Sequence, residues 1–415
     1  MFRKCQHFSP KEVFILPRSM WILLSGMMIN MIGSSFLWPL NTIYLHDYLG
    51  KSLSLAGFVL MLNSLASVIG NFLGGYLFDK IGGYKSVLIG AIISLGSLIG
   101  LTLFHGWPHY AVFLIIVGFG SAIVNPAMYA LAGATWKEGG RSTFNAMYVS
   151  ANVGVAIGTA ACGYIASLSI VYIFPANMLL YVVFFFIVIF GFKRLAGDAD
   201  VTARPARKMA GKGIERLSKS IIALTIVSIG YVIAHIAYSQ WQTTIATYTQ
   251  EINISLEQYS LLWTTNGALI VFGQPFIAYI NRTVTKKLKS QIMVGYIIFM
   301  AAFFIASKSI SFTGFLTAMI ILTVGEMFVW PAIPAIANDL AEPGRSGFYQ
   351  GFVNGAATIG RMIGPVLGGV VVDYFDMSAL FTLLLALFII AIVSTLIYDR
   401  GLFYKEKRSK TTELL

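Results

Sequence analysis

The chain has 415 residues, of which 57% are hydrophobic and only 11% are charged, and its formal net charge is +12. Soluble domains carry about 25% charged residues, so this composition, with a mean hydropathy of +0.77, excludes a water-soluble globular protein. The apolar stretches are continuous and long enough for helices that cross a bilayer, whereas the strands of a membrane barrel alternate over short segments. We therefore expect an all-α polytopic membrane protein.

Twelve apolar stretches have the length of a spanning helix. In chain order they cover residues 20–40, 53–77, 87–104, 110–133, 144–167, 170–192, 221–247, 258–280, 292–307, 313–337, 348–372 and 379–398. The longest hydrophilic segment follows the sixth stretch and is typical of a solvated linker, because it is basic and contains Gly, Pro and Ala. The predicted domains are an N-terminal six-helix half at 1–192, a cytoplasmic linker at 193–219, and a C-terminal six-helix half with a cytoplasmic tail at 220–415.

The basic residues indicate the orientation in the membrane. With both termini inside, all but three of the 29 Lys and Arg residues fall in inner segments; Lys51 and Lys308 lie in outer loops and Arg361 lies within a span. This bias satisfies the positive-inside rule. We therefore expect a multi-pass protein of the plasma membrane with both termini in the cytoplasm. The positive charge then reports topology and not nucleic-acid binding.

The two halves contain a repeated segment. One copy, "NPAMYALAGATWKEGGRSTFNAMYVSANVGVAIG", begins at Asn125, and the other, "WPAIPAIANDLAEPGRSGFYQGFVNGAATIG", begins at Trp330. Both run from a Pro-Ala pair through a short inner loop to Gly-Arg-Ser-x-Phe, and then into a Gly-rich span. Two parallel six-helix repeats, with the substrate site between them, form one of the major transporter architectures.

The loop after the second span, "GGYLFDKIGGYKS" at residues 74–86, contains the pattern G-x-L-x-D-K-x-G. This pattern resembles the loop motif of the major facilitator superfamily. Its first glycine lets two helices approach closely, and its aspartate can accept hydrogen bonds from the N-terminus of a neighbouring helix or from a basic residue. A latch that holds the cytoplasmic side closed is the expected role, and an ordinary polar turn is the alternative. The residues of this conformational gate are Gly75, Asp79, Lys80, Gly82 and Lys85.

The resemblance covers essentially the whole chain, including "TTNGALIVFGQP" in span eight, "VGEMFVWPA" in span ten and the glycine-proline motif "GRMIGPVLGG" in span eleven. The most similar branch is that of the drug–proton antiporters, in which a Gly-Glu pair recurs in span ten and its carboxylate serves protons or cations. The resemblance implies a twelve-helix fold that works by alternating access. No catalytic motif, metal-ligand cluster or phosphate loop appears, so we expect neither an enzyme nor a cofactor.

Among the carboxylates, only Glu326 lies deep within a predicted span. A charge at mid-bilayer costs about 2.5–3.5 kcal/mol on insertion scales, and such charges are usually functional. Because burial favours a neutral carboxyl group, Glu326 can be neutral in one conformation and ionised in another. This behaviour suits a proton-coupling site or a partner for a cationic substrate. The alternative is a structural ion pair with Arg361, and the two roles can coexist.

Span seven carries His235, Tyr238 and Gln242 on one helical face, which should line a cavity or a partner helix because polar groups facing lipid are costly. His235 is a candidate for proton transfer; the alternative is a neutral histidine that hydrogen bonds with a neighbour. Trp330 lies four residues after Glu326 and suits an aromatic, cationic guest. Its alternative is an anchor at the inner membrane surface.

Polar residues of spans one, five and eight complete a weakly polar cavity. The predicted proton-coupling residues are Glu326, Arg361 and His235, and the predicted substrate-binding residues are Asn30, Ser34, Asn152, Tyr238, Gln242, Asn266, Gln274 and Trp330. The expected function is proton-coupled export of small amphipathic or cationic compounds, as in multidrug efflux. Proton-coupled uptake, facilitated diffusion of a small metabolite and lipid flipping are the alternatives. The expected partners are the substrate, protons and the bilayer, and we expect a monomer.

Overall fold

The structure is a computed structural model that describes residues 16–37, 40–195 and 211–400. Over these ranges the secondary structure is helical and contains no strand. Twelve helical segments within them are long and apolar enough to cross a membrane. Helices are the expected solution, because a chain in lipid must satisfy its backbone hydrogen bonds internally. The predicted all-α fold with twelve spans is therefore confirmed.

The first half begins with α1 and ends with η4. Its segments are α1 (Arg18–Leu37), α2 (Asn41–Ile43), η1 (Tyr44–Tyr48), α3 (Leu53–Ile81), α4 (Gly83–Leu103), α5 (His109–Thr135), η2 (Lys137–Gly139), α6 (Arg141–Leu168), η3 (Ile170–Tyr172), α7 (Ile173–Phe186) and η4 (Ile187–Phe192). The second half comprises α9 (Gly211–Gln240), α10 (Thr244–Glu251), α11 (Leu256–Thr283), α12 (Leu288–Lys308), α13 (Phe312–Val329), α14 (Ala332–Leu340), α15 (Ser346–Tyr374) and α16 (Met377–Ile397).

The edges of the predicted linker at 193–219 are helical. The sixth span continues as helix to Leu195, and α9 already begins at Gly211. Basic residues at these edges continue the helices because Lys and Arg are good helix formers. The middle of the predicted linker, 196–210, lies outside the described residues.

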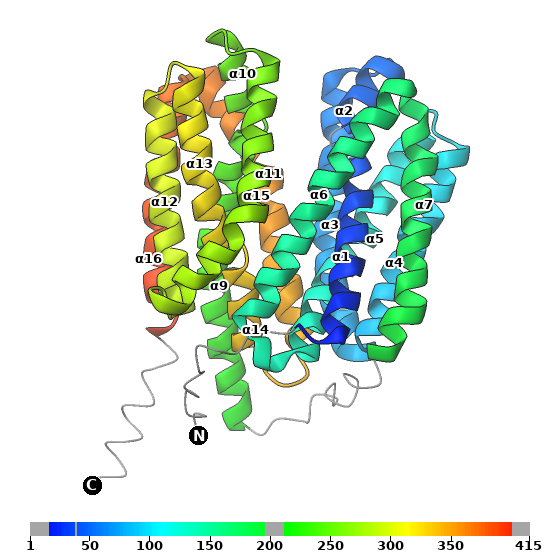
Figure 1. Ribbon diagram of the computed structural model, residues 1–415, viewed down its shortest axis with the longest axis vertical. Coiled ribbons are helices and arrows are strands. Elements are labelled where there is room, and N and C mark those ends of the chain that lie inside the picture. The colour runs from blue at the N-terminus through cyan, green and yellow to red at the C-terminus, as the bar shows by residue number, and fades with distance from the viewer. Residues whose placement is uncertain (1–15, 38–39, 196–210, 401–415) are drawn as a thin grey trace.

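Each half has its own hydrophobic core, one built from α1 to η4 and the other from α9 to α16. Figure 1 shows the two bundles side by side. We call the end where α1 begins and α16 ends the inner end, and the end that carries α2 and α10 the outer end. The ribbons of the two halves converge toward the inner end and diverge toward the outer end (Figure 1). The most extensive contact between the halves pairs α3 with α15, and α15 with α5 and α6 with α11 follow.

The repeated Gly-Arg-Ser segments occupy equivalent places in the two halves. Gly140 immediately precedes α6 with φ +46°, and Gly344 lies shortly before α15 with φ +81°. Both values fall in the left-handed region, which glycine adopts at little cost. The glycine of each repeat therefore lets the chain turn sharply from the inner loop into a spanning helix. Arg141 and Arg345 follow these glycines directly.

The tenth span is interrupted near its middle. Trp330 and Pro331 separate α13 from α14, as expected where a proline removes a backbone donor. Buried glutamines from neighbouring helices compensate: Gln291 Nε2 donates to the carbonyl of Phe328 at 2.7 Å, and Gln350 Nε2 donates to that of Pro334 at 2.8 Å. The break is thus supported by both neighbours, and it lies just beyond Glu326.

Candidate functional site

Glu326 lies at the midpoint of the span from Phe312 to Leu340, and only 3% of it is exposed. Its Oε1 accepts a hydrogen bond from Tyr148 Oη at 3.0 Å, and its Oε2 accepts one from Asn266 Nδ2 at 2.9 Å. The side chains of Tyr238 and Trp330 also lie close to this carboxylate. Neutral donors therefore surround the group on several sides, and they stabilise its anion without a cation.

The Tyr148 hydrogen bond connects the two halves, because Tyr148 lies on α6 and Glu326 lies on α13. A small apolar cluster formed by Tyr148, Met327, Phe328, Ile270 and others packs around this contact. Our sequence analysis did not include Tyr148 in the site. A signal was available, since Tyr148 falls between two asparagines of α6 at helical spacing, but tyrosine in a span also occurs as ordinary packing.

Arg361 and Glu326 form no ion pair in the described part of the chain. Arg361 Nη2 instead donates to Thr358 Oγ1 at 3.2 Å, and the same oxygen accepts from Asn71 Nδ2 of the first half at 3.2 Å. Tyr231 lies near enough to both charges to interact with each of them. In this conformation the structural ion pair is therefore absent, and Arg361 contributes to a contact between α15 and α3.

His235 is buried and stacks flat on Trp330, with ring centroids 4.4 Å apart and an interplanar angle of 3°. Neither ring nitrogen has a hydrogen-bond partner among the described residues. Trp330 also contacts Tyr231, Tyr238 and Phe299. The indole lies within an aromatic cluster next to Glu326, a position that favours the guest-binding role of Trp330 over its alternative, an anchor at the membrane surface. The hydrogen bond expected of a neutral His235 is not present.

We expect His235→Gln to retain proton-coupled transport, with at most an altered substrate affinity. The reason is that both imidazole nitrogens lie in an aromatic stack that offers a proton no acceptor or stabilising anion. His235→Phe is the matched variant, since it keeps the stack while removing the nitrogens. The measurement is proton movement coupled to substrate in proteoliposomes. Loss of proton movement in both variants, with substrate binding intact, would show that His235 carries the proton.

The other predicted substrate residues do not all reach this site. Tyr238, Asn266 and Trp330 gather around Glu326. Gln242 lies beyond the end of α9 and is exposed, because the helix ends at Gln240 and the chain turns at the buried Trp241. The expectation of one continuous polar face on span seven therefore fails at its last member.

Asn30 and Ser34 belong to a polar network inside the first half. Asn30 is fully buried, donates to Asn125 Oδ1 at 3.2 Å and accepts from Tyr181 Oη at 3.2 Å, while Ser34 donates to the Asn30 carbonyl at 2.9 Å. Asn152 donates to the carbonyl of Tyr148 on its own helix at 2.9 Å. Gln274 is buried on α11 without a partner among the described residues, and it faces a different cavity.

At the inner end, Asp79 accepts hydrogen bonds from the backbone N–H groups of Gly347 and Phe348, both at 2.7 Å. These are among the first residues of α15, where a carboxylate also interacts favourably with the helix dipole. Gly75 lies against Gly347, and a Cβ at Gly75 would be 2.2 Å from the Gly347 carbonyl oxygen. The placement of Asp79 is the one that a latch requires, and its gating role stays a prediction.

The remaining motif residues lie around this contact. Gly82 joins α3 directly to α4 with φ +87°. Lys80 is exposed, and its Nζ lies 5.4 Å from the centroid of the Tyr76 ring. Lys85 is exposed as well. Neither lysine contributes to the contact between the halves, so the geometry places the closing contact on Gly75 and Asp79.

A second contact between the halves at the inner end joins a cation to backbone carbonyls, whereas the first joins a carboxylate to backbone N–H groups. Arg141, at the start of α6, donates through Nη1 to the carbonyls of Asn281 at 2.9 Å and Thr285 at 3.0 Å, and through Nη2 to that of Lys286 at 2.8 Å. The Asn281 carbonyl lies in the last turn of α11 and the other two lie just beyond its C-terminal end, where a cation is favourable. Sequence analysis identified the repeated Gly-Arg-Ser but not this partner. Together the two contacts join the halves at the inner end.

Comparison with known proteins identifies the family. The family model of the Major Facilitator Superfamily matches residues 23–325 and 227–413. The chain is 54% identical over 400 residues to YttB, an uncharacterized MFS-type transporter of Bacillus subtilis (strain 168), covering 96% of this chain and all of the relative. It is 22% identical to the quinolone resistance protein NorA of Staphylococcus aureus (strain MRSA252), covering 88% and 90% of the two chains.

A similar solved structure is that of a bacterial homologue of the iron transporter ferroportin in an outward-facing state. It has a TM-score of 0.75 and 15% sequence identity, and the match covers 92% of this chain and 99% of that chain. At this identity the likeness bears on the fold alone. The match of the family model along the chain, together with the 54% identical relative, shows that the chain belongs to the Major Facilitator Superfamily.

Proposed function

We propose that this secondary transporter exports small amphipathic or cationic compounds in exchange for protons. The observation that carries the proposal is the Glu326 carboxylate, which is buried at mid-span, has no cationic partner among the described residues, and hydrogen bonds with Tyr148 of the opposite half. A titratable group with these properties can respond to protons and to the relative position of the halves. NorA, a relative over most of the chain, is a quinolone resistance protein, which supports an efflux role.

The proposed coupling begins with the Tyr148–Glu326 contact. A hydrogen bond to a carboxylate is roughly twice as strong as one between neutral groups. Protonation of Glu326 therefore weakens the contact between α6 and α13 and favours separation of the halves at the inner end. Loss of the proton restores the anion and makes the site available to a cation. Proton and cationic substrate then compete for Glu326, and by linkage each weakens binding of the other equally, as exchange requires.

The chemistry around Glu326 supports an aromatic cation as substrate. Trp330 and Tyr238 border the carboxylate, and Trp263 packs edge-on against Tyr238 with ring centroids 6.0 Å apart. Aromatic faces attract cations, and the attraction increases when the pair is shielded from water. A planar lipophilic cation can therefore stack on these rings while its charge lies near Glu326.

The test uses the purified protein in liposomes with an acidic lumen, a clamped membrane potential, and ethidium as the lipophilic cation. Exchange should accumulate ethidium in the lumen while the lumen becomes more alkaline. If a protonophore collapses the pH gradient before ethidium is added, ethidium should neither accumulate nor change the luminal pH. An exchanger does this in either orientation, so a mixed population of inserted molecules does not blur the result. Protein-free liposomes give the background caused by passive partition of ethidium.

The directions in which ethidium and protons move distinguish exchange from symport and from facilitated diffusion. Symport would move ethidium out of the acidic lumen together with protons. Facilitated diffusion would equalise ethidium without any change in luminal pH. Either outcome contradicts the proposed exchange, and so does ethidium accumulation that survives the protonophore.

A further inference from the structure

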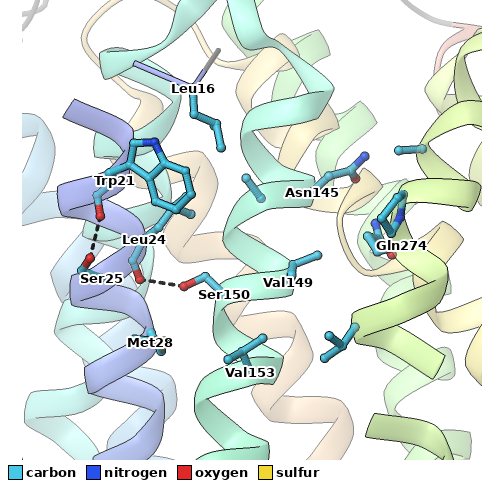
Figure 2. A pocket seen from close by; sticks show the side chains of 14 residues that line it. Leu16, Trp21, Leu24, Ser25, Met28, Asn145, Val149, Ser150, Val153 and Gln274 are labelled. Atoms are coloured by element: carbon cyan, nitrogen blue, oxygen red, sulfur yellow. Dashed lines mark hydrogen bonds between the residues drawn. The ribbon is translucent and has the colours of Figure 1, made fainter. Parts of the chain in front are cut away.

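A groove of about 450 Å³ lies between α1, α6 and α11 in the inner part of the bundle. Figure 2 shows Leu24 and Met28 of α1 on one side, Val149 and Val153 of α6 in the middle, and Gln274 of α11 on the other side. Most of the lining side chains are apolar. The walls therefore come from both halves of the transporter, at the level of its spanning helices.

The groove continues toward the inner end into a polar cavity of about 220 Å³. Asn145 and Ala278 line both cavities, and Arg141 and Lys286 line only the polar one. Lys286 is exposed, and no described carboxylate forms an ion pair with it. The combined groove is thus apolar in its interior. At the end that faces the membrane surface it carries Arg141, whose charge Asp339 partly offsets, and the positive charge of Lys286.

Three buried amide side chains along the groove have at least one polar atom without a partner among the described residues. Both amide atoms of Gln274, the Oδ1 of Asn145 and the Nδ2 of Asn281 are unpaired, while these residues are only 3%, 8% and 1% exposed. Buried polar atoms in native proteins are nearly always paired, so unpaired ones indicate a missing partner. A ligand with both acceptor and donor groups at the junction of the two cavities would supply it.

We propose that the combined groove binds one anionic phospholipid of the inner leaflet. Its acyl chain would lie between α1, α6 and α11, and its phosphate would lie near Arg141 and Lys286. Because the helices around the groove span the membrane and Trp21 at its rim is 58% exposed, lipid is the molecule adjacent to its opening. Positive charge at this end favours an anionic headgroup over a zwitterionic one.

This lipid would favour the conformation described here. The groove needs α6 of the first half beside α11 of the second, and Arg141 already joins these helices. A ligand that binds only when the halves meet shifts the population toward that state. Bound lipid therefore stabilises closure of the inner end, and it does so independently of the substrate and of the coupling ion.

The test compares phosphatidylglycerol with phosphatidylcholine of identical acyl chains, added to the full-length protein in mild detergent. Native mass spectrometry counts the bound lipids, and thermal melting reports their effect on stability. Phosphatidylglycerol should be retained more strongly and should raise the melting midpoint further. Lys286→Gln should reduce its retention about fivefold, the effect of one basic residue near an anionic surface.

Lys287→Gln is the matched control, since Lys287 is also exposed but does not line either cavity. It should bind phosphatidylglycerol as the unsubstituted protein does. Ala278→Trp, which fills the groove, should abolish retention of the specific lipid. Equal retention of the two lipids, equal effects of the Lys286 and Lys287 substitutions, or the same stabilisation by inorganic phosphate alone would overturn the proposal. Lys286→Gln changes an exposed side chain, so the test remains interpretable if Ala278→Trp does not fold.

Discussion

Glu326→Gln is expected to abolish the pH dependence of substrate binding and to stop transport driven by a proton gradient. Glutamine has the shape of the protonated acid, so it can still pair with Tyr148 and Asn266, but it cannot bind or release a proton. Where a proton and a cation compete for one site, affinity falls by about tenfold per pH unit on the acid side of its titration. The variant should show no such slope.

The measurement is ethidium affinity from about pH 5 to about pH 9, a range chosen to cover the titration of a carboxyl group whose pKa is raised by burial. Glu251→Gln is the matched control, because Glu251 is exposed at the end of α10. Tyr148→Phe keeps the carboxylate and removes only the hydrogen-bond donor from the other half. Its substrate affinity should therefore still depend on pH, but proton binding should drive transport poorly. If Glu326→Gln and the unsubstituted protein have the same pH dependence, the coupling site lies elsewhere.

Asp79→Asn should open the inner end. The carboxylate accepts two backbone hydrogen bonds from α15, and a hydrogen bond to a charged group contributes about 1.5–3 kcal/mol. An asparagine amide offers one acceptor oxygen and turns two donors toward the helix N-terminus, so at least one of these bonds is lost. The population of the closed state should fall roughly 10- to 150-fold relative to the open state.

The rate of thiol modification at the inner end measures this change in the population of the closed state. In a background without Cys5 and Cys162, single cysteines replacing Ser142 or Ser346 should react faster from the inner side when Asp79 is substituted. Asp376→Asn is the matched control, since Asp376 caps α16 by accepting from Ala379 N at 2.6 Å but does so within one half. Unchanged reactivity together with full transport would mean that the loop is an ordinary polar turn.

The sequence was sufficient for the fold because lipid leaves a chain few choices. Continuous apolar stretches can only be helices there, and the charge of inner loops indicates how they alternate. Glu326 was recognisable on the same basis, as one carboxylate far from either end of its span. Asp79 could also be assigned a geometry, because a short motif at a helix end limits which atoms it can reach.

Partners on neighbouring helices could not be predicted. The 3.6-residue period indicates which residues of one helix share a face, but it contains no information about the register of one helix against another. Asn266 and Gln274 lie on the same helix, yet only Asn266 reaches Glu326, and Gln274 faces the groove between α1, α6 and α11. The end of α9 was misjudged for a related reason, since Trp241 turns inward to pack between Phe303 and Phe315.

The meeting of Gly75 and Gly347 fixes how far the inner end can close. Each glycine lies against the carbonyl oxygen of the other, and a Cβ added to either would lie 2.2 Å from that oxygen. Contact between main-chain atoms thus limits the approach of α3 to α15, so the distance between these helices in the closed state does not depend on side-chain rotamers. Closure also orders no side chain at these two glycines, so the conformational entropy that longer side chains would lose there is not lost. Each transport cycle can therefore return to the same end point whichever compound has been carried.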